Sequence, residues 1–247
     1  MPVRLLHALA SNSGDLFSGL GWPDSRSDER VEVELLRPAT PERLAERLRF
    51  TTDGAPIEAE VDLSGREPHQ IGSIRLQCAI GASSFGQSGL LIHGAGLALE
   101  GRGAVAAFAP SGGGKSTLSN LAERFSGLSD ETVLLVPGPP SQIFATPLRS
   151  SSIKVPEPRV DPLRALLILE KSLEPSFTRV SPQVAMRALL AQVYKLPTEL
   201  APPAQLFKRA AKLVENVPAY RFAFPKSPAA QDLLLRLFDD ELQPEIP

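Results

Sequence analysis

The sequence has very little cysteine, because Cys78 is the only one among its 247 residues. A single cysteine excludes an intramolecular disulfide and any metal site built from several thiolates. Cys78 lies in residues 74–80, where apolar and polar side chains alternate as in a strand. We therefore expect a small buried side chain there, not a catalytic thiol.

The sequence also lacks an excess of either charge and any long hydrophobic run. A formal net charge of −2 gives no general attraction to nucleic acid or to an anionic membrane, so we expect neither as a partner. No segment approaches the roughly 20 apolar residues of a membrane helix, and the apolar stretch at the N-terminus is too short for a signal peptide. With 43% hydrophobic residues the chain can bury a core, and we expect a cytoplasmic protein.

What the sequence does contain is the segment APSGGGKST, residues 109–117, which has the spacing of a phosphate-binding loop. Three successive glycines let backbone N–H groups point inward at phosphate oxygens, and the following helix adds the positive end of its dipole. Lys115 would reach the β- and γ-phosphates and Ser116 would hold a magnesium ion. The candidate nucleotide-binding residues are Ser111, Gly112, Gly113, Gly114, Lys115, Ser116 and Thr117.

The surroundings of this segment agree with a phosphate-binding loop. Residues 103–108 are small and apolar, as in a buried strand, and residues 117–125 place their apolar side chains on one face of a helix. Ala109 replaces the first glycine of the common pattern, which costs little if its φ is negative. The alternative is a glycine-rich turn that binds nothing, but turn chemistry does not explain Lys-Ser directly after glycine.

An acidic pair, Asp130-Glu131, follows 15 residues after Lys115. An ABC-type ATPase would instead need a signature helix and a strand ending in Asp-Glu far downstream, and the sequence has neither. Transfer of a phosphoryl group to a hydroxyl needs a carboxylate that aligns or deprotonates the acceptor, and Asp130 is placed to do so. The alternative interpretation is a solvated turn between the helix and the next strand.

Residues 91–136 resemble the HPr kinase family, the serine kinases of a phosphocarrier protein, which share a catalytic fold with phosphoenolpyruvate carboxykinases. The resemblance rests on a strand ending in His93, a hairpin around residues 101–103, the phosphate loop and the acidic pair. It implies an α/β fold with a curved mixed sheet, flanking helices and the loop at one end. It also implies ATP and Mg²⁺ bound by Lys115 and Ser116, Asp130 as the base, Glu131 as a metal partner, and His93 beside the acidic pair.

The chain departs from that family in two respects. It has Asp-Glu where two aspartates are usual and a slightly shorter helix, which leaves the roles of Asp130 and Glu131 open. It also lacks a glycine-rich loop with a basic cluster for docking the carrier protein. Residues 145–149 and 217–221 are instead similar to small HPr-kinase-related proteins such as lasso-peptide kinases. The acceptor implied is a serine on a peptide or small protein, and a homo-oligomer stays open.

A further cation is expected to neutralise charge in the transition state. Four residues are candidates: Arg102, Arg149, Lys154 and Arg221. We favour Arg149 as a catalytic residue, because it follows Thr146-Pro147 at the end of a strand. His93 has a structural alternative, since a histidine at a strand end can serve as a hydrogen-bonded structural residue.

Two other functional classes are alternatives to a kinase. A decarboxylating carboxykinase would be much longer and would need more metal-binding histidines and lysines than a chain with three histidines supplies. A non-catalytic module that binds or senses a nucleotide stays open as the alternative to a kinase. Transfer from ATP to candidate peptides would separate the two.

The chain is predicted to consist of a mostly-β N-terminal region, residues 1–85, and an HPr-kinase-like P-loop catalytic domain, residues 86–247. The boundary is placed in the glycine- and serine-rich residues 81–89. In the first region we expect strands at 30–36 and 57–63 and a helix at 41–50. In the second we expect strands at 90–93, 97–100, 133–136, 142–145, 163–169 and 219–224, and helices at 181–194, 202–216 and 228–238. The N-terminal strands either recognise the acceptor or complete the catalytic sheet.

Overall fold

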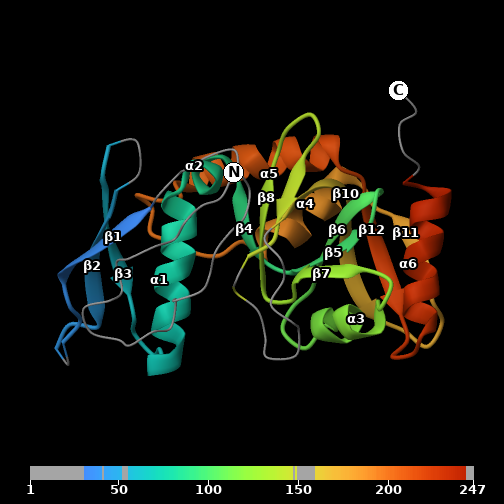
Figure 1. The fold of residues 1–247 in the computed structure, drawn as a ribbon, viewed down its shortest axis with the longest axis horizontal. Coiled ribbons are helices and arrows are strands. Elements are labelled where there is room, and N and C mark those ends of the chain that lie inside the picture. Colours follow the sequence, from blue (N-terminus) through green and yellow to red (C-terminus); the bar gives the residue numbers. More distant parts are fainter. Residues whose placement is uncertain (1–30, 41, 52–54, 147, 149–158, 243–247) are drawn as a thin grey trace. The chain divides into compact units, whose positions relative to one another are not determined.

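The protein is described by a computed structural model that covers residues 31–40, 42–51, 55–146, 148 and 159–242 (Figure 1). The chain divides into two compact units. The first unit is formed by Met1–Gly89 and Lys195–Leu206, and the second unit by Leu90–Tyr194 and Phe207–Pro247. The described residues form six helices and two sheets, so the fold is of the mixed α/β class that the sequence predicts.

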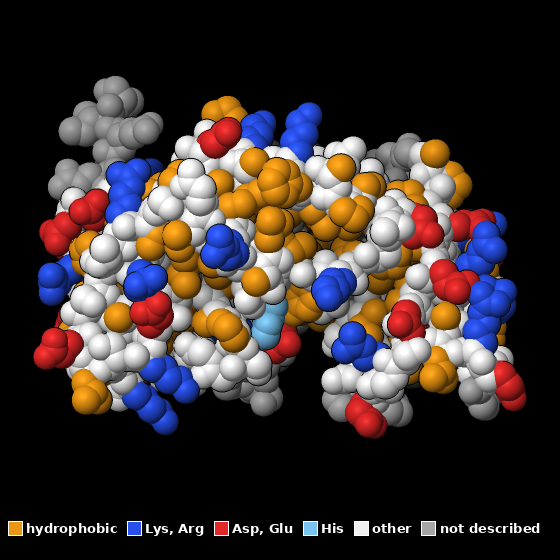
Figure 2. Space-filling model, turned by 180° about the vertical axis from the view of Figure 1, so that it is seen from behind, with side chains coloured by type: hydrophobic (Ala, Val, Ile, Leu, Met, Phe, Trp, Pro, Cys, Tyr) orange, Lys and Arg blue, Asp and Glu red, His pale blue; other side chains and the backbone are white. Residues whose placement is uncertain are grey.

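Charged side chains of both signs are interspersed on the face of the molecule drawn in Figure 2, with hydrophobic side chains between them. This agrees with a sequence of nearly balanced charge. Within the described ranges, no helix combines the length and the apolar character needed to cross a membrane.

The first unit contains a three-stranded antiparallel sheet covered by helices. Its elements are β1 (Glu32–Arg37), β2 (Ala45–Thr51), β3 (Ile57–Asp62), α1 (Pro68–Ala82) and α2 (Ser84–Ser88), and the strand order is β1-β2-β3. Phe50 and Val61 of the sheet share a core with Cys78 of α1. The returning segment completes this core, because Leu200 is buried in it and a Cβ on Gly81 would lie 2.5 Å from Cδ1 of Leu196.

Two strands of this unit match the sequence, and two predictions for it are wrong. The helix expected at 41–50 is strand β2, in which Leu48 and Phe50 point inward and Arg47 outward. The strand expected at 74–80 lies in helix α1, although Cys78 is buried as predicted. Residues 81–89, where the boundary was placed, contain helix α2, whose Gly86 has no room for a Cβ, because the atom would lie 1.8 Å from the carbonyl oxygen of Ile80.

The second unit contains a nine-stranded mixed sheet. Its strands are β4 (Leu90–His93), β5 (Ala95–Leu99), β6 (Gly103–Phe108), β7 (Ser126–Ser129), β8 (Thr132–Val136), β9 (Gln142–Phe144), β10 (Val160–Lys171), β11 (Ser176–Arg179) and β12 (Ala219–Phe224). The main order is β4-β8-β9-β10-β6-β5-β7, and β12 joins β10 to β11. β10 is parallel to β6 and β12, whereas the other pairs are antiparallel. The strands predicted for this unit are confirmed, and β7 and β11 were not predicted.

The sheet must fold over on itself, because strands that are distant in its order are joined by very short connections. The single residue Gly94 joins β4 to β5, and two residues, Asp130 and Glu131, join β7 to β8. A Cβ on Gly96 of β5 would lie 2.9 Å from Cβ of Leu128 and 3.1 Å from Cγ1 of Val133. β5 therefore packs closely against the start of β8, and both short connections lie at this fold of the sheet.

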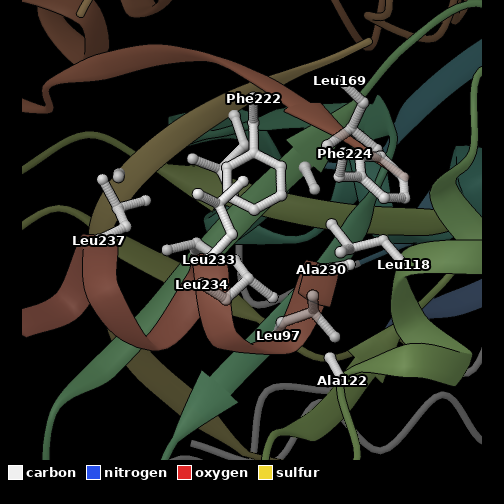
Figure 3. Close-up of a cluster of buried hydrophobic side chains, with 14 of the residues drawn as sticks. Leu97, Leu118, Ala122, Leu169, Phe222, Phe224, Ala230, Leu233, Leu234 and Leu237 are labelled. Carbon is white, nitrogen blue, oxygen red and sulfur yellow. The ribbon is translucent and has the colours of Figure 1, made fainter. Parts of the chain in front are cut away.

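The remaining four helices are α3 (Lys115–Leu121), α4 (Pro182–Leu190), α5 (Pro203–Asn216) and α6 (Ala229–Asp240). α3 and α6 contribute Leu118, Leu234 and other apolar side chains to a core with Phe222 and Phe224 of β12 (Figure 3). The rings of Phe125 and Phe238 lie 5.7 Å apart in the same core. Burial of these side chains fixes the position of α3, and with it the loop that precedes α3.

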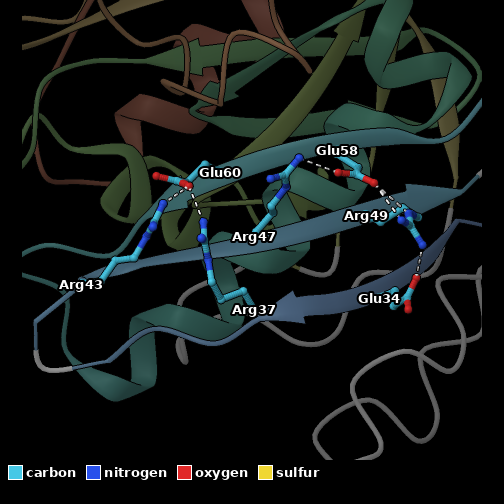
Figure 4. A network of polar contacts seen from close by, with 7 residues as sticks. All are labelled: Glu34, Arg37, Arg43, Arg47, Arg49, Glu58 and Glu60. Carbon is cyan, nitrogen blue, oxygen red and sulfur yellow. Dashed lines mark hydrogen bonds and ion pairs between the residues drawn. The ribbon is translucent and has the colours of Figure 1, made fainter.

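The exposed face of the first unit's sheet has a network of arginine and glutamate side chains, which we call the ladder (Figure 4). Its members are Glu34, Arg37, Arg43, Arg47, Arg49, Glu58 and Glu60. Glu58 pairs with Arg47 and Arg49, each at 2.8 Å, and Glu60 pairs with Arg37 at 2.9 Å. Neighbouring strands place opposite charges next to one another, so each charge of the ladder has a partner in the same sheet.

Candidate functional site

The predicted phosphate loop lies between β6 and α3, so the expected strand, loop and helix are confirmed. Gly112 and Gly114 have φ values of 75° and 103°, in the left-handed region that favours glycine. Gly113 is needed for space, because a Cβ there would lie 2.4 Å from Cβ of Ala109. Gly114 packs against Phe224, whose Cζ would lie 2.9 Å from an added Cβ. The three glycines are thus required by the conformation and packing of the loop.

Lys115 is buried at the first position of α3, with 7% of its surface exposed. Its Nζ donates a hydrogen bond of 3.0 Å to the carbonyl oxygen of Ala109 at the start of the loop. Burial lowers the pKa of Lys115, and the negative charges of Glu131 and Asp130 partly oppose that shift. The lysine therefore lies over the loop and within electrostatic reach of the acidic pair.

The pairing of the strands brings the acidic pair and His93 to the end of the sheet where the loop begins. His93 is paired with Thr132, the start of β5 with the end of β6, and Gly96 with Ser129. The backbone N–H of Gly94 donates a hydrogen bond of 3.1 Å to the carbonyl oxygen of Glu131. Residues from three separate parts of the sequence thus meet at the fold of the sheet.

The acidic pair lies in a turn between β7 and β8, and not directly after the helix as the sequence suggested. The hydroxyl of Ser129 accepts hydrogen bonds from the N–H groups of Glu131 and Thr132, at 3.1 and 3.0 Å, and donates one of 2.6 Å to the carbonyl oxygen of Leu148. Asp130 is buried, with 1% of its surface exposed, whereas Glu131 is exposed. The turn is therefore held from beneath by a buried serine.

His93 lies half-buried at the end of β4. Burial lowers the pKa of its imidazole, the positive charge of Lys115 lowers it further, and the negative charge of Glu131 raises it. The net shift of the pKa is downward from 6.5, so the site favours the uncharged imidazole. The three predicted site residues His93, Lys115 and Glu131 are thus coupled electrostatically.

Tyr194 is a residue of this region that the sequence did not single out. Its hydroxyl lies 2.9 Å from Oγ1 of Thr132, and 3.4 Å from the carbonyl oxygen of Glu131, to which it donates. Its ring centroid lies 6.2 Å from that of His93. No motif precedes it in the sequence, and only the pairing of its segment with β4 brings it to the site.

A magnesium ion fits the donor set of this region. Ser116, partly exposed in the first turn of α3, and the exposed carboxylate of Glu131 offer the oxygen ligands that Mg²⁺ prefers. No group of three or more His, Cys, Asp or Glu side chains suited to a metal occurs in the described part of the chain. Mg²⁺ at phosphates uses one or two protein ligands together with phosphate oxygens and water, so a larger cage is not required.

The expected additional cation is not identified among the described residues. Arg149, the favoured candidate, and Lys154 lie outside them. Arg102 precedes β6, at the opposite end of that strand from the loop, and pairs with Asp239 at 2.5 Å and stacks on Phe238. The structure therefore does not bring Arg102 to the loop. Arg221 pairs with Glu170 at 3.0 Å.

Comparison with known proteins gives no further assignment at this site. No family model matches the chain, and no curated protein matches its sequence.

Proposed function

We propose that this chain is an ATP-dependent phosphotransferase of the HPr kinase type, acting on a serine hydroxyl of a peptide or small protein. The observation that carries the proposal is that a lysine-bearing glycine loop and an acidic turn lie within electrostatic reach of each other at one fold of the sheet. The Gly94–Glu131 hydrogen bond ties the acidic turn to the connection between β4 and β5 at the same fold. A loop that only shapes a turn needs no carboxylates within electrostatic reach of its lysine.

In the proposed reaction the loop N–H groups hold the phosphates of ATP, and Lys115 turns from the Ala109 carbonyl to the β- and γ-phosphates. Ser116 and Glu131 would hold a Mg²⁺ ion, which would neutralise negative charge that develops on the phosphates during transfer. Asp130 accepts the proton of the acceptor hydroxyl. The hydroxyl oxygen forms a bond to the γ-phosphorus, the bond from that phosphorus to the bridging oxygen breaks, and ADP leaves.

The uncharged imidazole of His93 completes the proposed site. The charge of Lys115 lowers its pKa and the charge of Glu131 raises it. A neutral imidazole can both donate and accept a hydrogen bond. We assign it to hold the acidic turn and the acceptor in register during transfer. The peptide or small-protein acceptor follows from the resemblance to the small HPr-kinase-related proteins.

The test compares Lys115→Met with Lys208→Met, a control in which an exposed lysine of α5 is replaced. Because the loop lysine makes charge-assisted hydrogen bonds to phosphate, its loss should weaken Mg-ATP binding by about 1.5–3 kcal/mol in calorimetry. The control should bind as the wild type does. Equal affinity for ATP in all three proteins would refute a nucleotide site at this loop.

Transfer is then measured with γ-labelled ATP and a peptide library that is degenerate around one central serine. Incorporation of label that is lost in Lys115→Met supports the kinase. Binding of ATP without transfer to any peptide, to the protein itself or to water would favour the non-catalytic nucleotide-binding module.

A further inference from the structure

Beyond the residues that the sequence indicated, the geometry points to Tyr194 as a positioning residue that holds the acidic turn in place through hydrogen bonds to Thr132 and Glu131. This inference rests on the proposed function for its kinetic consequences. Its structural basis, however, is independent of any ligand.

The position of Tyr194 is fixed by its backbone. The N–H of His93 donates to the carbonyl oxygen of Gln192 at 2.8 Å, and the N–H of Tyr194 donates to the carbonyl oxygen of Leu91 at 2.9 Å. Ile92 and Val193 form an antiparallel bridge between these bonds. The segment therefore pairs with β4, the same strand that carries His93, so His93 and Tyr194 are placed by one short ladder.

The phenol hydroxyl then contacts the turn from the side of β4. It lies 2.9 Å from Oγ1 of Thr132, and 3.4 Å from the carbonyl oxygen of Glu131. That carbonyl also accepts from the N–H of Gly94, and the carbonyl of Thr132 accepts from Oγ1 of Thr146 at 2.5 Å. Tyr194 thus belongs to a set of polar groups that fixes the backbone of the turn without using either acidic side chain.

A turn with only two residues between strands has few backbone torsions that can absorb a lost contact. Without the phenol hydroxyl, the turn would keep its bonds to Ser129 and to the N–H of Gly94 but lose those that Tyr194 makes to Thr132 and Glu131. Displacement of a catalytic carboxylate by about 1 Å can lower a rate by on the order of 100-fold. Nucleotide affinity should change little, because the loop and Lys115 keep their own contacts.

The experiment uses Tyr194→Phe, which removes only the hydroxyl. The matched control is Tyr220→Phe: the chain has two tyrosines, and the hydroxyl of Tyr220 hydrogen-bonds to Glu241 at 3.2 Å, beyond the end of α6. Tyr194→Phe should lower kcat by on the order of 10- to 100-fold with the KM for ATP within about twofold of wild type. Tyr220→Phe should leave both constants unchanged.

Thr132→Val provides a second route to the same contact. Because it removes the hydroxyl partner of Tyr194, the double variant should lose little more activity than Tyr194→Phe alone. Effects that multiply in the double variant would show that the two hydroxyls act separately, and would overturn the inference.

Amide hydrogen exchange tests the inference without any turnover. The amides of Glu131 and Thr132, which are bonded to Ser129, should exchange faster in Tyr194→Phe than in wild type or Tyr220→Phe. Unchanged exchange at these amides would overturn the positioning role, even for a protein that transfers no phosphate. Conversely, faster exchange together with unaltered ATP affinity in Lys115→Met would refute the proposed function but not the positioning of the turn.

Discussion

The two units use charged side chains in opposite ways. In the ladder of the first unit, each arginine pairs with a glutamate side chain, and the pairs are largely exposed to solvent. At the fold of the second unit's sheet, Lys115 donates to a backbone carbonyl instead, and among these described residues no ion pair joins it to Asp130 or Glu131. The paired charges of the ladder stabilise the sheet, whereas a lysine bonded to a backbone carbonyl can turn to a ligand.

The hydrogen bonds of the ladder and of the acidic turn also differ. The ladder consists of side chains bonded to side chains, and removal of one leaves its neighbours free to take up water. The acidic turn is held by backbone groups bonded to Ser129, Tyr194 and Gly94. An arrangement that fixes the backbone next to the acidic side chains is typical of a reacting site, where groups must be oriented before the substrate arrives.

The largest expected effect is the loss of transfer in Asp130→Asn. If Asp130 accepts the proton of the acceptor, the amide should lower the rate by about 10²–10⁴-fold and leave ATP affinity unchanged. Glu131→Gln should in addition raise the Mg²⁺ concentration needed for half-maximal rate, because it removes a metal ligand. Both are measured by steady-state transfer at varied Mg²⁺.

The control for these variants is Asp240→Asn, at the exposed end of α6. A wild-type rate for Asp130→Asn would return that residue to a structural role. If Asp130→Asn raised the Mg²⁺ requirement and Glu131→Gln did not, Asp130 would be the metal ligand and Glu131 the base.

The next largest effect concerns a charge pair of the first unit whose carboxylate is buried, between Glu46 and Arg75. Glu46 of β2 is 4% exposed and is bonded to Arg75 of α1, so Arg75→Ala leaves a buried carboxylate without its partner. We expect the free energy of unfolding of this unit to fall by about 3–5 kcal/mol. Arg47→Ala, which removes an exposed member of the ladder, should have a much smaller effect.

Chemical labelling of the Cys78 thiol measures the effect of breaking the Glu46–Arg75 pair. Burial raises the pKa of its thiol to about 12, so the folded unit should resist thiol reagents, and labelling should report opening of the unit. Arg75→Ala should accelerate labelling strongly and Arg47→Ala only slightly. Equal acceleration in both variants would contradict the distinction between buried and exposed pairs.

The smallest expected effect is a pair of opposite pKa shifts at His93. Lys115→Met removes a positive charge and should raise the pKa of the imidazole, whereas Glu131→Gln removes a negative charge and should lower it. Titration followed by NMR without added metal measures both. Shifts in the same direction would show that the three side chains are not coupled as described.

The wild-type pKa also sets a pH dependence of stability. The folded pKa of His93 is below the ordinary value of 6.5, so the unfolded chain takes up the proton first as the pH falls. The contribution of His93 to stability is therefore complete above 6.5 and decreases as the pH falls from 6.5 through the folded pKa.

Much of the second unit could be predicted from sequence, because its strands are short apolar runs separated by glycine or proline. The first unit was harder. In β2 the inward-facing Glu46 interrupts the apolar alternation, and its partner lies 29 residues away in Arg75. Helix α1 is buried on most sides near its C-terminal end, so no single apolar stripe marks it. A usable signal was Pro68 at the start of the helix with Gln70, whose side chain caps the N–H of Glu67 at 3.1 Å.

The site was predictable where chemistry lies in consecutive residues, as in the loop and the acidic pair. Their convergence was not, because it depends on β7, a four-residue strand of serine, glycine and leucine with little strand propensity. Tyr194 could not be found either, since its role comes only from the pairing of its segment with β4. Arg149 stays a prediction.

The discontinuity of the first unit has a consequence for synthesis on the ribosome. Its core includes Leu196 and Leu200, which are translated roughly 110 residues after Gly89. Synthesis adds about 5–20 residues per second. The early part of this unit is therefore made on the order of 6–20 s before the side chains that complete its core. During that interval the apolar side of α1 around Gly81 has no Leu196 to cover it, so this surface stays uncovered until the returning segment is made.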